Sequence, residues 1–497
     1  MTGPIQNLQL AEPLEPLLPL HDPPLESPPD LLEMMRRRAA RLHLSLPRAR
    51  PVLLSLIAFA TLFSVLLLSS HERAATSHFP GEETNSPYSE CPEVYPPPPP
   101  PPPKPVEEEP SYLVGSPTQG FRENLRNDTR YITSWYHAGW TNDVITLGNL
   151  IYLAILTDRV PIIPPFTPSH VNKTAGPIPV SEVFDLARLA KTLGRPMLEW
   201  QDVKDTASTQ VDDLGCWSVW DGVTSHGPRE GDALAAMHLD VSWTRVPDFV
   251  RVGTDDHALF SPLASLGFPA LRSQSLPSLP PPRPSRQHQA VLYPDEHLLC
   301  YDFLYFVTSF RVYEMEYDYS PVWRDVLRHL RWSTQLEALA DEYIRRSLNV
   351  AEGSDTPPYI GIHFRRGDFL NYCPEHSENG CFAPLTTFSE RVAEIQQKLF
   401  EQKGIRVSHV IMTSDEKDPS WWDEVTAMGW SRVDHVGEGT AEKYGLWYPV
   451  LIDAVIQSSG LGFVGTDKST MTLIAQRRVE DWHGGIASVV RWILSTS

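Results

Sequence analysis

The sequence predicts an α/β protein in which a parallel sheet is covered by helices, preceded by one transmembrane helix and a proline-rich stem. Three observations predict this. Apolar strand segments alternate with amphipathic helices over residues 359–478, a charge-free apolar run occupies 52–68, and successive prolines fill 96–103. Alternating strands and helices at this spacing are typical of parallel sheets. The 497 residues allow more than one folded lobe, because single cores stop growing near about 250–300 residues.

The apolar run is expected to form a single signal anchor within residues 52–69. It is just long enough to span a bilayer, which takes about 17–25 residues. Only Arg73 follows the run closely, whereas six arginines precede it: Arg36, Arg37, Arg38, Arg41, Arg48 and Arg50. By the positive-inside rule, a disordered tail at 1–51 is cytoplasmic and the large C-terminal part is luminal. A cleaved signal peptide is the alternative, but the run begins too late and no Ala-x-Ala site follows it cleanly.

Residues 70–118 are expected to form a stem that holds a folded region away from the membrane. The prolines at 96–103 would form a stiff polyproline II rod of about 25 Å, at roughly 3.1 Å per residue. Such a tract also suits SH3 or WW domains, but those are cytosolic and this tract is predicted to be luminal. We expect a single-pass protein of the Golgi or ER membrane, with the choice between the two open.

Charge and cysteine usage limit the functional class. The net charge of −20 argues against a nucleic-acid-binding protein, which needs a basic surface. The five cysteines contain no CxxC pair, so neither a zinc ribbon nor a thioredoxin-like site is expected. Cys373 and Cys381 bracket a short polar loop and are predicted to form a disulfide in an oxidising compartment. Asn127 and Asn172 begin Asn-x-Thr sequons and are candidate glycosylation sites.

The folded part is expected to divide into an N-terminal lobe at 119–350 and a C-terminal lobe at 351–497. In the first lobe, a helix of apolar periodicity precedes a short strand at 159–166, and another helix covers 335–348. The proline- and serine-rich segment near 273–289 is predicted to be a disordered loop.

The C-terminal lobe shows the alternation most clearly. Asp418-Pro419 predicts the start of one helix, because an aspartate cap followed by proline is a strong start signal. The remaining strands are predicted at 359–364, 408–413 and 461–464, and the remaining helices at 388–402, 448–459 and 469–478.

Polar residues gather where these predicted strands end. A guanidinium at Arg365 can bind phosphate oxygens in a bidentate manner. A helix start offers unpaired N–H groups and partial positive charge, and Ser469 and Thr470 add hydroxyl groups there. Since ligands bind at the carboxyl ends of parallel strands, the pattern predicts a nucleotide-diphosphate site. Its candidate residues are His363, Arg365, Arg366, Asp368, Ser414, Asp415, Thr466, Ser469 and Thr470.

Other phosphate-binding motifs are missing or misplaced in the sequence. Gly460-Leu-Gly462-Phe-Val-Gly465 fits the GxGxxG pattern, but it overlaps the predicted strand 461–464 instead of following a strand, so dinucleotide binding is not favoured. The sequence contains no Walker A motif, so P-loop chemistry is not favoured either. It also lacks an Asp-x-Asp pair, and no metal or other cofactor is expected. Arginine and helix-dipole charge would then stabilise a leaving group.

Three motifs resemble the GDP-fucose protein O-fucosyltransferase family. The segment from His363 to Phe369, HFRRGDF, resembles its H-x-R-R-x-D-[FW] signature. Gly139-Trp-Thr-Asn142, followed by an apolar helix and LTDRVPIIPPF, is similar to its N-terminal G-x-x-N motif. FVGTDKSTM at 463–471 is similar to its C-terminal F-x-G-[TN]-x-x-S-[TS]-[FM] motif.

The resemblance implies a GT-B architecture of two Rossmann-like lobes, with GDP-fucose in the C-terminal lobe and an acceptor in the cleft. It also implies metal-independent, inverting transfer. Arg365 would contact the diphosphate and assist the departure of GDP, while Asn142 reaches across from the first lobe. Further donor-binding candidates are Gly139, His363, Arg366, Thr466, Ser469 and Thr470, with Asp415 and Asp453 as candidates for guanine contact or for bracing the loop.

The general base is not assigned by the motifs. Some family members place a glutamate immediately before the glycine of the first turn, where this sequence has Ala138. His137 or Asp368 could serve instead, and some members rely on the arginine without a base.

Several alternatives stay open. The charged residues after strand 359–364 could be a solvated ion-pair cluster of little energetic value. Arg366-Gly367-Asp368 spells RGD, a motif of adhesion proteins. A third alternative is a relative that binds sugar nucleotides without catalysis. The acceptor is also open, because a serine or threonine of a secreted protein and a glycan hydroxyl are equally consistent with these residues.

Overall fold

The computed structural model describes residues 111–351, 353–372 and 382–491. Pro105–Ser497 form one compact unit. The predicted tail, anchor and polyproline tract lie outside the described residues. Within the described ranges, no helix combines the length and the apolar character that crossing a bilayer requires.

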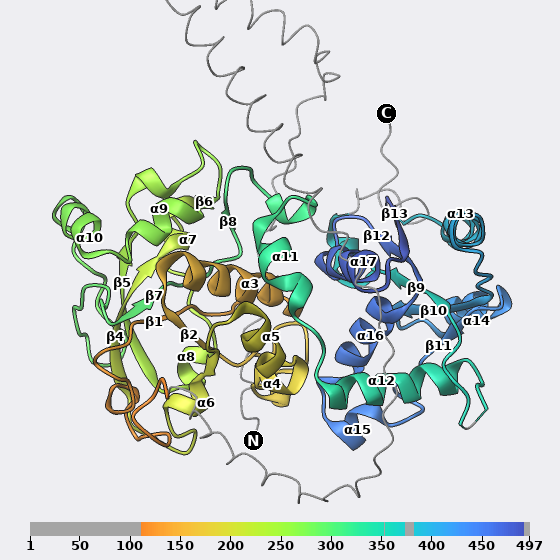
Figure 1. The fold of residues 1–497 in the computed structure, drawn as a ribbon, viewed down its shortest axis with the longest axis horizontal. Coiled ribbons are helices and arrows are strands. Elements are labelled where there is room, and N and C mark those ends of the chain that lie inside the picture. The colour runs from red at the N-terminus through yellow and green to blue at the C-terminus, as the bar shows by residue number, and fades with distance from the viewer. Residues whose placement is uncertain (1–110, 352, 373–381, 492–497) are drawn as a thin grey trace, which may run out of the picture. The chain divides into compact units, whose positions relative to one another are not determined.

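The first sheet has four parallel strands in the order β3-β2-β1-β7 (Figure 1). The helix predicted after Gly139 is α3, Trp140–Thr157, and it connects β1 to β2. It ends at Asp158, whose left-handed backbone (φ 52°) turns the chain into β2. The strands are β1 Tyr131–Thr133, β2 Val160–Ile163, β3 Leu198–Glu199 and β7 Leu298–Cys300.

Shorter elements surround this sheet. Two further parallel pairs are β4 Asp212–Ser218 with β5 Leu239–Arg245, and β6 Ala258–Leu259 with β8 Val307–Thr308. The accompanying helices are α4 Val180–Val183, α5 Leu186–Leu193, α6 Trp200–Val203, α7 Val219–Thr224, α8 Ala233–Ala236, α9 Phe260–Ser265, α10 Pro269–Ser275, α11 Pro321–Asp325 and α12 Thr334–Ser347.

A disulfide joins the edge of this region to the first sheet. Cys216 of β4 is bonded to Cys300 of β7, and both side chains are fully buried. The sequence did not reveal this pair, because spacing alone does not fix disulfide connectivity. The predicted Cys373–Cys381 pair lies outside the described residues.

The structure corrects the prediction of a disordered loop near 273–289. Helix α10 and a 3₁₀ turn at Leu276–Ser278 cover its first part. Further on, the backbone N–H and C=O of Arg283 pair with those of Trp243. The carboxylate of Asp240 then accepts backbone N–H groups from 286–288. A low-hydrophobicity segment is thus ordered by a buried carboxylate that composition does not reveal.

The second sheet has five parallel strands in the order β11-β10-β9-β12-β13. Strands β9, β10 and β12 confirm the predicted alternation, whereas the edge strands β11 and β13 were not predicted. The side chain of Asp418 accepts the N–H of Ser420 as the expected helix cap. The strands are β9 Tyr359–Phe364, β10 His409–Ser414, β11 Ser431–Arg432, β12 Gly462–Thr466 and β13 Ile486–Val490. The helices are α13 Leu385–Lys403, α14 Pro419–Ala427, α15 Thr440–Tyr444, α16 Tyr448–Ser459 and α17 Thr470–His483.

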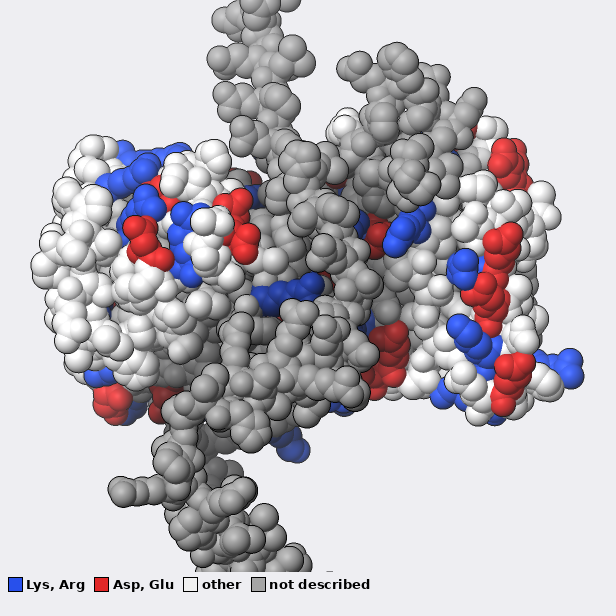
Figure 2. Space-filling view, turned by 90° about the horizontal axis from the view of Figure 1, so that it is seen from above, with Lys and Arg blue, Asp and Glu red and all other residues white. Residues whose placement is uncertain are grey.

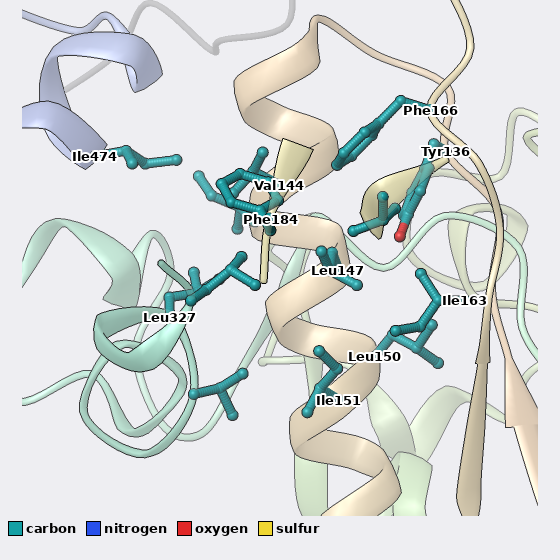
Figure 3. Packing of buried hydrophobic residues seen from close by; sticks show 14 of the residues in the cluster. Tyr136, Val144, Leu147, Leu150, Ile151, Ile163, Phe166, Phe184, Leu327 and Ile474 are labelled. Atoms are coloured by element: carbon teal, nitrogen blue, oxygen red, sulfur yellow. The ribbon is translucent and has the colours of Figure 1, made fainter. Parts of the chain in front are cut away.

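One apolar cluster surrounds α3 and includes side chains from both sheet regions. Val144, Leu147, Leu150 and Ile151 of α3 are buried in it, and Ile474 of α17 belongs to the same cluster (Figure 3). A Cβ at position 148 would lie 2.7 Å from Leu327, so glycine there allows the close approach of this neighbouring chain. The two sheet regions are therefore held together by a shared core. The lobe boundary near 350 remains a prediction, since α12 packs on both α4 and α16.

Candidate functional site

The carboxyl end of β9 brings together three of the predicted site residues. Nη2 of Arg365 lies 2.6 Å from Oδ1 of Asp368, and Nη1 lies 2.7 Å from Oδ2 of Asp415. The arginine side chain is 23% exposed, so a ligand in solvent can reach it. We call Arg365, Asp368 and Asp415 the strand-end cluster. Its two carboxylates hold the guanidinium in place and must share it with any bound anion.

Thr466 connects the ends of β9 and β12. Its Oγ1 accepts the backbone N–H of Arg365 at 2.9 Å and donates to the carbonyl of His363 at 3.1 Å. The residues that precede α17 are therefore in direct contact with the backbone of the predicted catalytic arginine. This is the convergence that the two sequence motifs predict.

His363 is buried below this contact. Its Nδ1 lies 2.9 Å from Oγ1 of Thr472. Burial, followed by the charge of Arg365, lowers the pKa of His363 to about 3. The imidazole is therefore neutral near pH 7. It can hydrogen-bond a nucleotide but cannot supply a positive charge to it.

The side chain of Arg366 is held by an ion pair and by aromatic rings. Its Nε lies 2.7 Å from Oε2 of Glu416, and the guanidinium stands over the rings of Phe364, Phe382 and Trp421. An adhesive RGD motif needs its arginine free on a loop tip. The aromatic packing and the ion pair of Arg366 argue against the adhesion alternative.

Two long helices begin at the same place. Oγ1 of Thr141, in the first turn of α3, lies 2.7 Å from Oγ1 of Thr470, the first residue of α17. Ser469 precedes α17 as its cap residue, and its hydroxyl makes no capping hydrogen bond. Each helix start carries unpaired N–H groups and partial positive charge. Two such ends beside one another, near Arg365, favour an anionic ligand.

Asn142 adds an unsatisfied group at this junction. It follows Thr141 in the first turn of α3, and its Oδ1 is buried without a hydrogen-bond partner among the described residues. Gly139 immediately precedes α3. A buried acceptor without a partner costs free energy unless a ligand or water satisfies it. The predicted donor contact of Asn142 is consistent with this position.

His170 is a site residue that the sequence interpretation missed. Its ring lies 3.3 Å from where a Cβ of residue 139 would be, so it packs against the turn before α3. Burial and then the positive charge of Arg365 lower the pKa of His170, while Asp368 and Asp415 act in the opposite direction. These interactions place His170 near the strand-end cluster. Its position after the predicted strand 159–166 was the available signal.

His137, one of the predicted bases, has a different setting. Its side chain is exposed, and its carbonyl accepts hydrogen bonds from the Arg229 guanidinium, with Nη2 at 2.8 Å. Partial desolvation and then Arg229 lower the pKa of His137. The backbone N–H of Arg229 in turn donates to the buried carboxylate of Asp302. These contacts fix the loop after β1, and the role of His137 as base remains a prediction.

Asp453 lies in a separate hydrogen-bond network. Its Oδ1 is 3.0 Å from Nε2 of His435, whose Nδ1 is 3.1 Å from Oγ1 of Thr440. Tyr343 of α12 also hydrogen-bonds that hydroxyl. The network connects α16 to α15 and α12. Guanine contact and bracing of the loop by Asp453 both remain predictions.

Asp213, Asp240 and His288 form a cluster with metal-ligand residue types. The Asp240 carboxylate already accepts the Ser285 hydroxyl and backbone N–H groups from 286–288. His288 Nδ1 lies 2.8 Å from Oδ1 of Asp213. The cluster therefore orders a loop.

The remaining surface predictions have simple outcomes. Asn127 and Asn172 are both exposed, as glycosylation requires, and their modification remains a prediction. Figure 2 shows acidic and basic side chains interspersed on the coloured part of one face. That pattern does not favour a nucleic-acid surface.

Comparison with known proteins bears directly on the site. Residues 281–480 match a family model. The family is GDP-fucose protein O-fucosyltransferase. The matched range contains the strand-end cluster, Thr466 and the start of α17. The match confirms the predicted resemblance over 200 of the 497 residues and supports a GDP-fucose-dependent glycosyltransferase.

Solved structures similar to this chain include POFUT1 and NodZ. POFUT1 in complex with GDP-fucose is 16% identical, with 74% of this chain and 98% of that chain covered and a TM-score of 0.44. POFUT1 in complex with GDP is 14% identical, with 73% and 99% covered and a TM-score of 0.46. Fucosyltransferase NodZ from Bradyrhizobium is 14% identical, with 70% and 93% covered and a TM-score of 0.35. No curated protein matches the sequence.

Proposed function

We propose that the chain transfers fucose from GDP-fucose to a hydroxyl group of a secreted protein or a glycan in the lumen of the secretory pathway. Two contacts carry the proposal: the backbone N–H of Arg365 donates to Thr466, which precedes α17 in the chain, and α17 and α3 begin in contact through Thr470 and Thr141. All of these residues except Thr141 lie in the family-matched range. These cationic and N–H groups suit a diphosphate. The buried Cys216–Cys300 disulfide supports an oxidising compartment.

The proposed reaction is an inverting displacement. The acceptor oxygen forms a bond to C1 of fucose while the bond between C1 and the β-phosphate oxygen breaks. GDP leaves with the electron pair of that bond, and the hydroxyl proton passes to a base. Negative charge therefore grows on the diphosphate as the bond breaks. Arg365 and the N–H groups at the start of α17 would stabilise that charge without reorganising.

The two carboxylates that contact Arg365 differ in how firmly they are held. Asp415 accepts the backbone N–H of Arg366 at 2.8 Å in addition to its ion pair with Arg365, so two contacts fix its position. Asp368 is the more exposed partner, at 42% against 28% for Asp415. We infer that the diphosphate displaces Asp368 from the guanidinium, whereas Asp415 continues to orient it.

We infer that His170 is the base, because it lies close enough to Arg365 for the guanidinium charge to affect its pKa. Desolvation and then that charge lower the pKa of His170, which favours the neutral imidazole. An imidazole in this state can accept the acceptor proton. We expect His170→Gln to lower kcat about 10²–10⁴-fold and to remove the acidic limb of the pH profile. His137→Gln is the matched comparison, and a larger loss in that variant would move the role to His137.

The test of the function uses the full-length protein and labelled GDP-fucose. Wild-type protein should release GDP and transfer label to an acceptor, or slowly to water. Arg365→Ala should abolish this, and Arg406→Ala, which removes an exposed arginine stacked on Phe400, should not. Tight donor binding with no turnover would instead identify a non-catalytic relative.

A further inference from the structure

A cavity of about 360 Å³ lies at the opposite edge of the first sheet from the fucosyl site. Arg130, Arg159 and His297 line it, and they immediately precede β1, β2 and β7. The register pairs Tyr131 with Val160 and with Leu298, so the three lining residues lie at the amino ends of adjacent parallel strands. The turn before α3, in contrast, follows the carboxyl end of β1. The cavity is therefore not part of the site described above.

The lining is strongly basic. Three arginines, Arg130, Arg159 and Arg272, share the cavity with one carboxylate, Glu296. These groups leave two positive charges in excess. The neighbouring Asp295 also acts on Arg159 and Arg272, but its charge is offset by an ion pair with Arg122 at 2.8 Å. The side chain of Glu296 is 65% exposed, so its charge is screened by water and offsets the buried guanidinium groups poorly.

The two buried arginines, Arg159 and Arg272, differ in how many of their N–H donors are hydrogen-bonded. Arg159 is 4% exposed and donates to the carbonyls of Tyr131, His297 and Gly267, which makes it a structural tie between strand starts. Burial lowers its pKa to about 10, so it stays protonated at neutral pH. Arg159 supplies charge to the cavity, but its bonded N–H groups are committed.

Arg272 has an unused donor. It is 7% exposed, and its Nη2 donates to the carbonyl of Pro294. Its Nε is buried without a hydrogen-bond partner among the described residues, since Oε1 of Glu296 is 3.7 Å away, beyond hydrogen-bond distance. A buried, charged donor left unpaired is costly and is normally satisfied by a ligand or water. The exposed guanidinium of Arg130 completes the donor set.

We propose that this cavity binds a sulfate or phosphate group, held by Arg130 and Arg272, at a site separate from that of GDP-fucose. A tetrahedral dianion matches both the excess of positive charge and the fork geometry of guanidinium donors. The volume is at the lower end of about 300–1,000 Å³ for small-molecule sites. It therefore accommodates either the free ion or an ester of a small sugar.

Calorimetric titration of the full-length protein tests the proposal. The probes are inorganic sulfate, glucose 6-sulfate and uncharged glucose, at constant ionic strength set with chloride. Sulfate should bind saturably and glucose should not. If glucose 6-sulfate binds more tightly than sulfate, the site takes an ester; if it binds more weakly, the site takes the free ion. Binding of glucose as tight as that of sulfate, or the absence of saturable sulfate binding, would overturn the proposal.

Variants of exposed residues locate the site without disturbing the fold. Arg130→Gln should weaken sulfate binding at least about tenfold, as expected for loss of a charge-assisted hydrogen bond. Glu296→Gln should strengthen it about twofold to fivefold, because a competing exposed carboxylate is removed. Arg406→Gln is the matched charge control and should bind as wild type. Loss of sulfate binding in Arg365→Ala would place the ion in the GDP-fucose site and would overturn the proposal. Sulfate binding that is unchanged in both the Arg130 and the Glu296 variant would also overturn it, because the cavity would then not be where sulfate binds.

Discussion

Removal of the Cys216–Cys300 disulfide should destabilise the protein by several kcal/mol. The bridge joins residues 84 positions apart. In the chain-entropy description, closing a loop of that length removes about 15 cal/mol/K from the unfolded chain, or about 4.5 kcal/mol at 25 °C. Domains are typically stable by only about 5–15 kcal/mol. The bridge therefore carries a large share of the stability of the region it closes.

Urea unfolding, followed by tryptophan fluorescence, measures this effect. Reduced wild-type protein and the Cys216→Ala/Cys300→Ala double variant should lose a similar free energy of unfolding, about 3–5 kcal/mol. The reduced protein keeps both side chains, so agreement between the two isolates the cross-link from the loss of packing. Peptide mapping without reductant should recover the two cysteines in one linked fragment. A loss below about 1 kcal/mol in both forms, or recovery of the two cysteines unlinked, would refute the assignment.

Three further changes probe the Asp453 network and the strand-end cluster. Burial lowers the pKa of His435, but the carboxylate of Asp453 raises it overall, and Asp453→Asn removes that carboxylate. The stabilisation provided by the Asp453–His435 ion pair is complete below about pH 6.5. It is lost as pH rises through the folded-state pKa of His435. The variant should therefore unfold about 2 kcal/mol more easily at pH 5.5 but match wild type at pH 9, and a constant difference would contradict this. Asp368→Asn should lower the KM for GDP-fucose about twofold to fivefold with kcat nearly unchanged, whereas a 100-fold fall in kcat would assign Asp368 as the base. Gly367→Ala places a Cβ against the carboxylate of Asp415 and should raise the KM for GDP-fucose about tenfold. Gly115→Ala is the control, because its Cβ would have open space around it.

The sequence predicted β9, β10 and β12, the three central strands of the second sheet, because their signals are local, but it missed the edge strands β11 and β13. Apolar runs of strand length bounded by turns defined β9, and the cap at Asp418 defined the start of α14. Motifs at the ends of these strands predicted that Arg365, after β9, would lie beside the end of β12, where its backbone N–H donates to Thr466, since parallel strands bring their carboxyl ends to one edge.

Features that depend on distant pairs could not be predicted in this way. The disulfide joins cysteines whose spacing carries no signature. The segment near 273–289 is ordered by the carboxylate of Asp240, which lies well before it in the chain. His170 joins the site only because the loop after β2 folds back onto Gly139. Composition and periodicity predict the local structure of a segment, whereas these contacts depend on residues that are distant in sequence.

Binding and turnover of GDP-fucose by Arg365 variants test the central claim most directly. Calorimetry and GDP release are measured together on the full-length wild type, Arg365→Ala and Arg365→Lys. We expect both variants to lose turnover by about 10²–10³-fold or more, with Lys recovering part of the donor affinity because it restores charge without the bidentate fork. Turnover in Arg365→Ala that equals wild type would contradict the account.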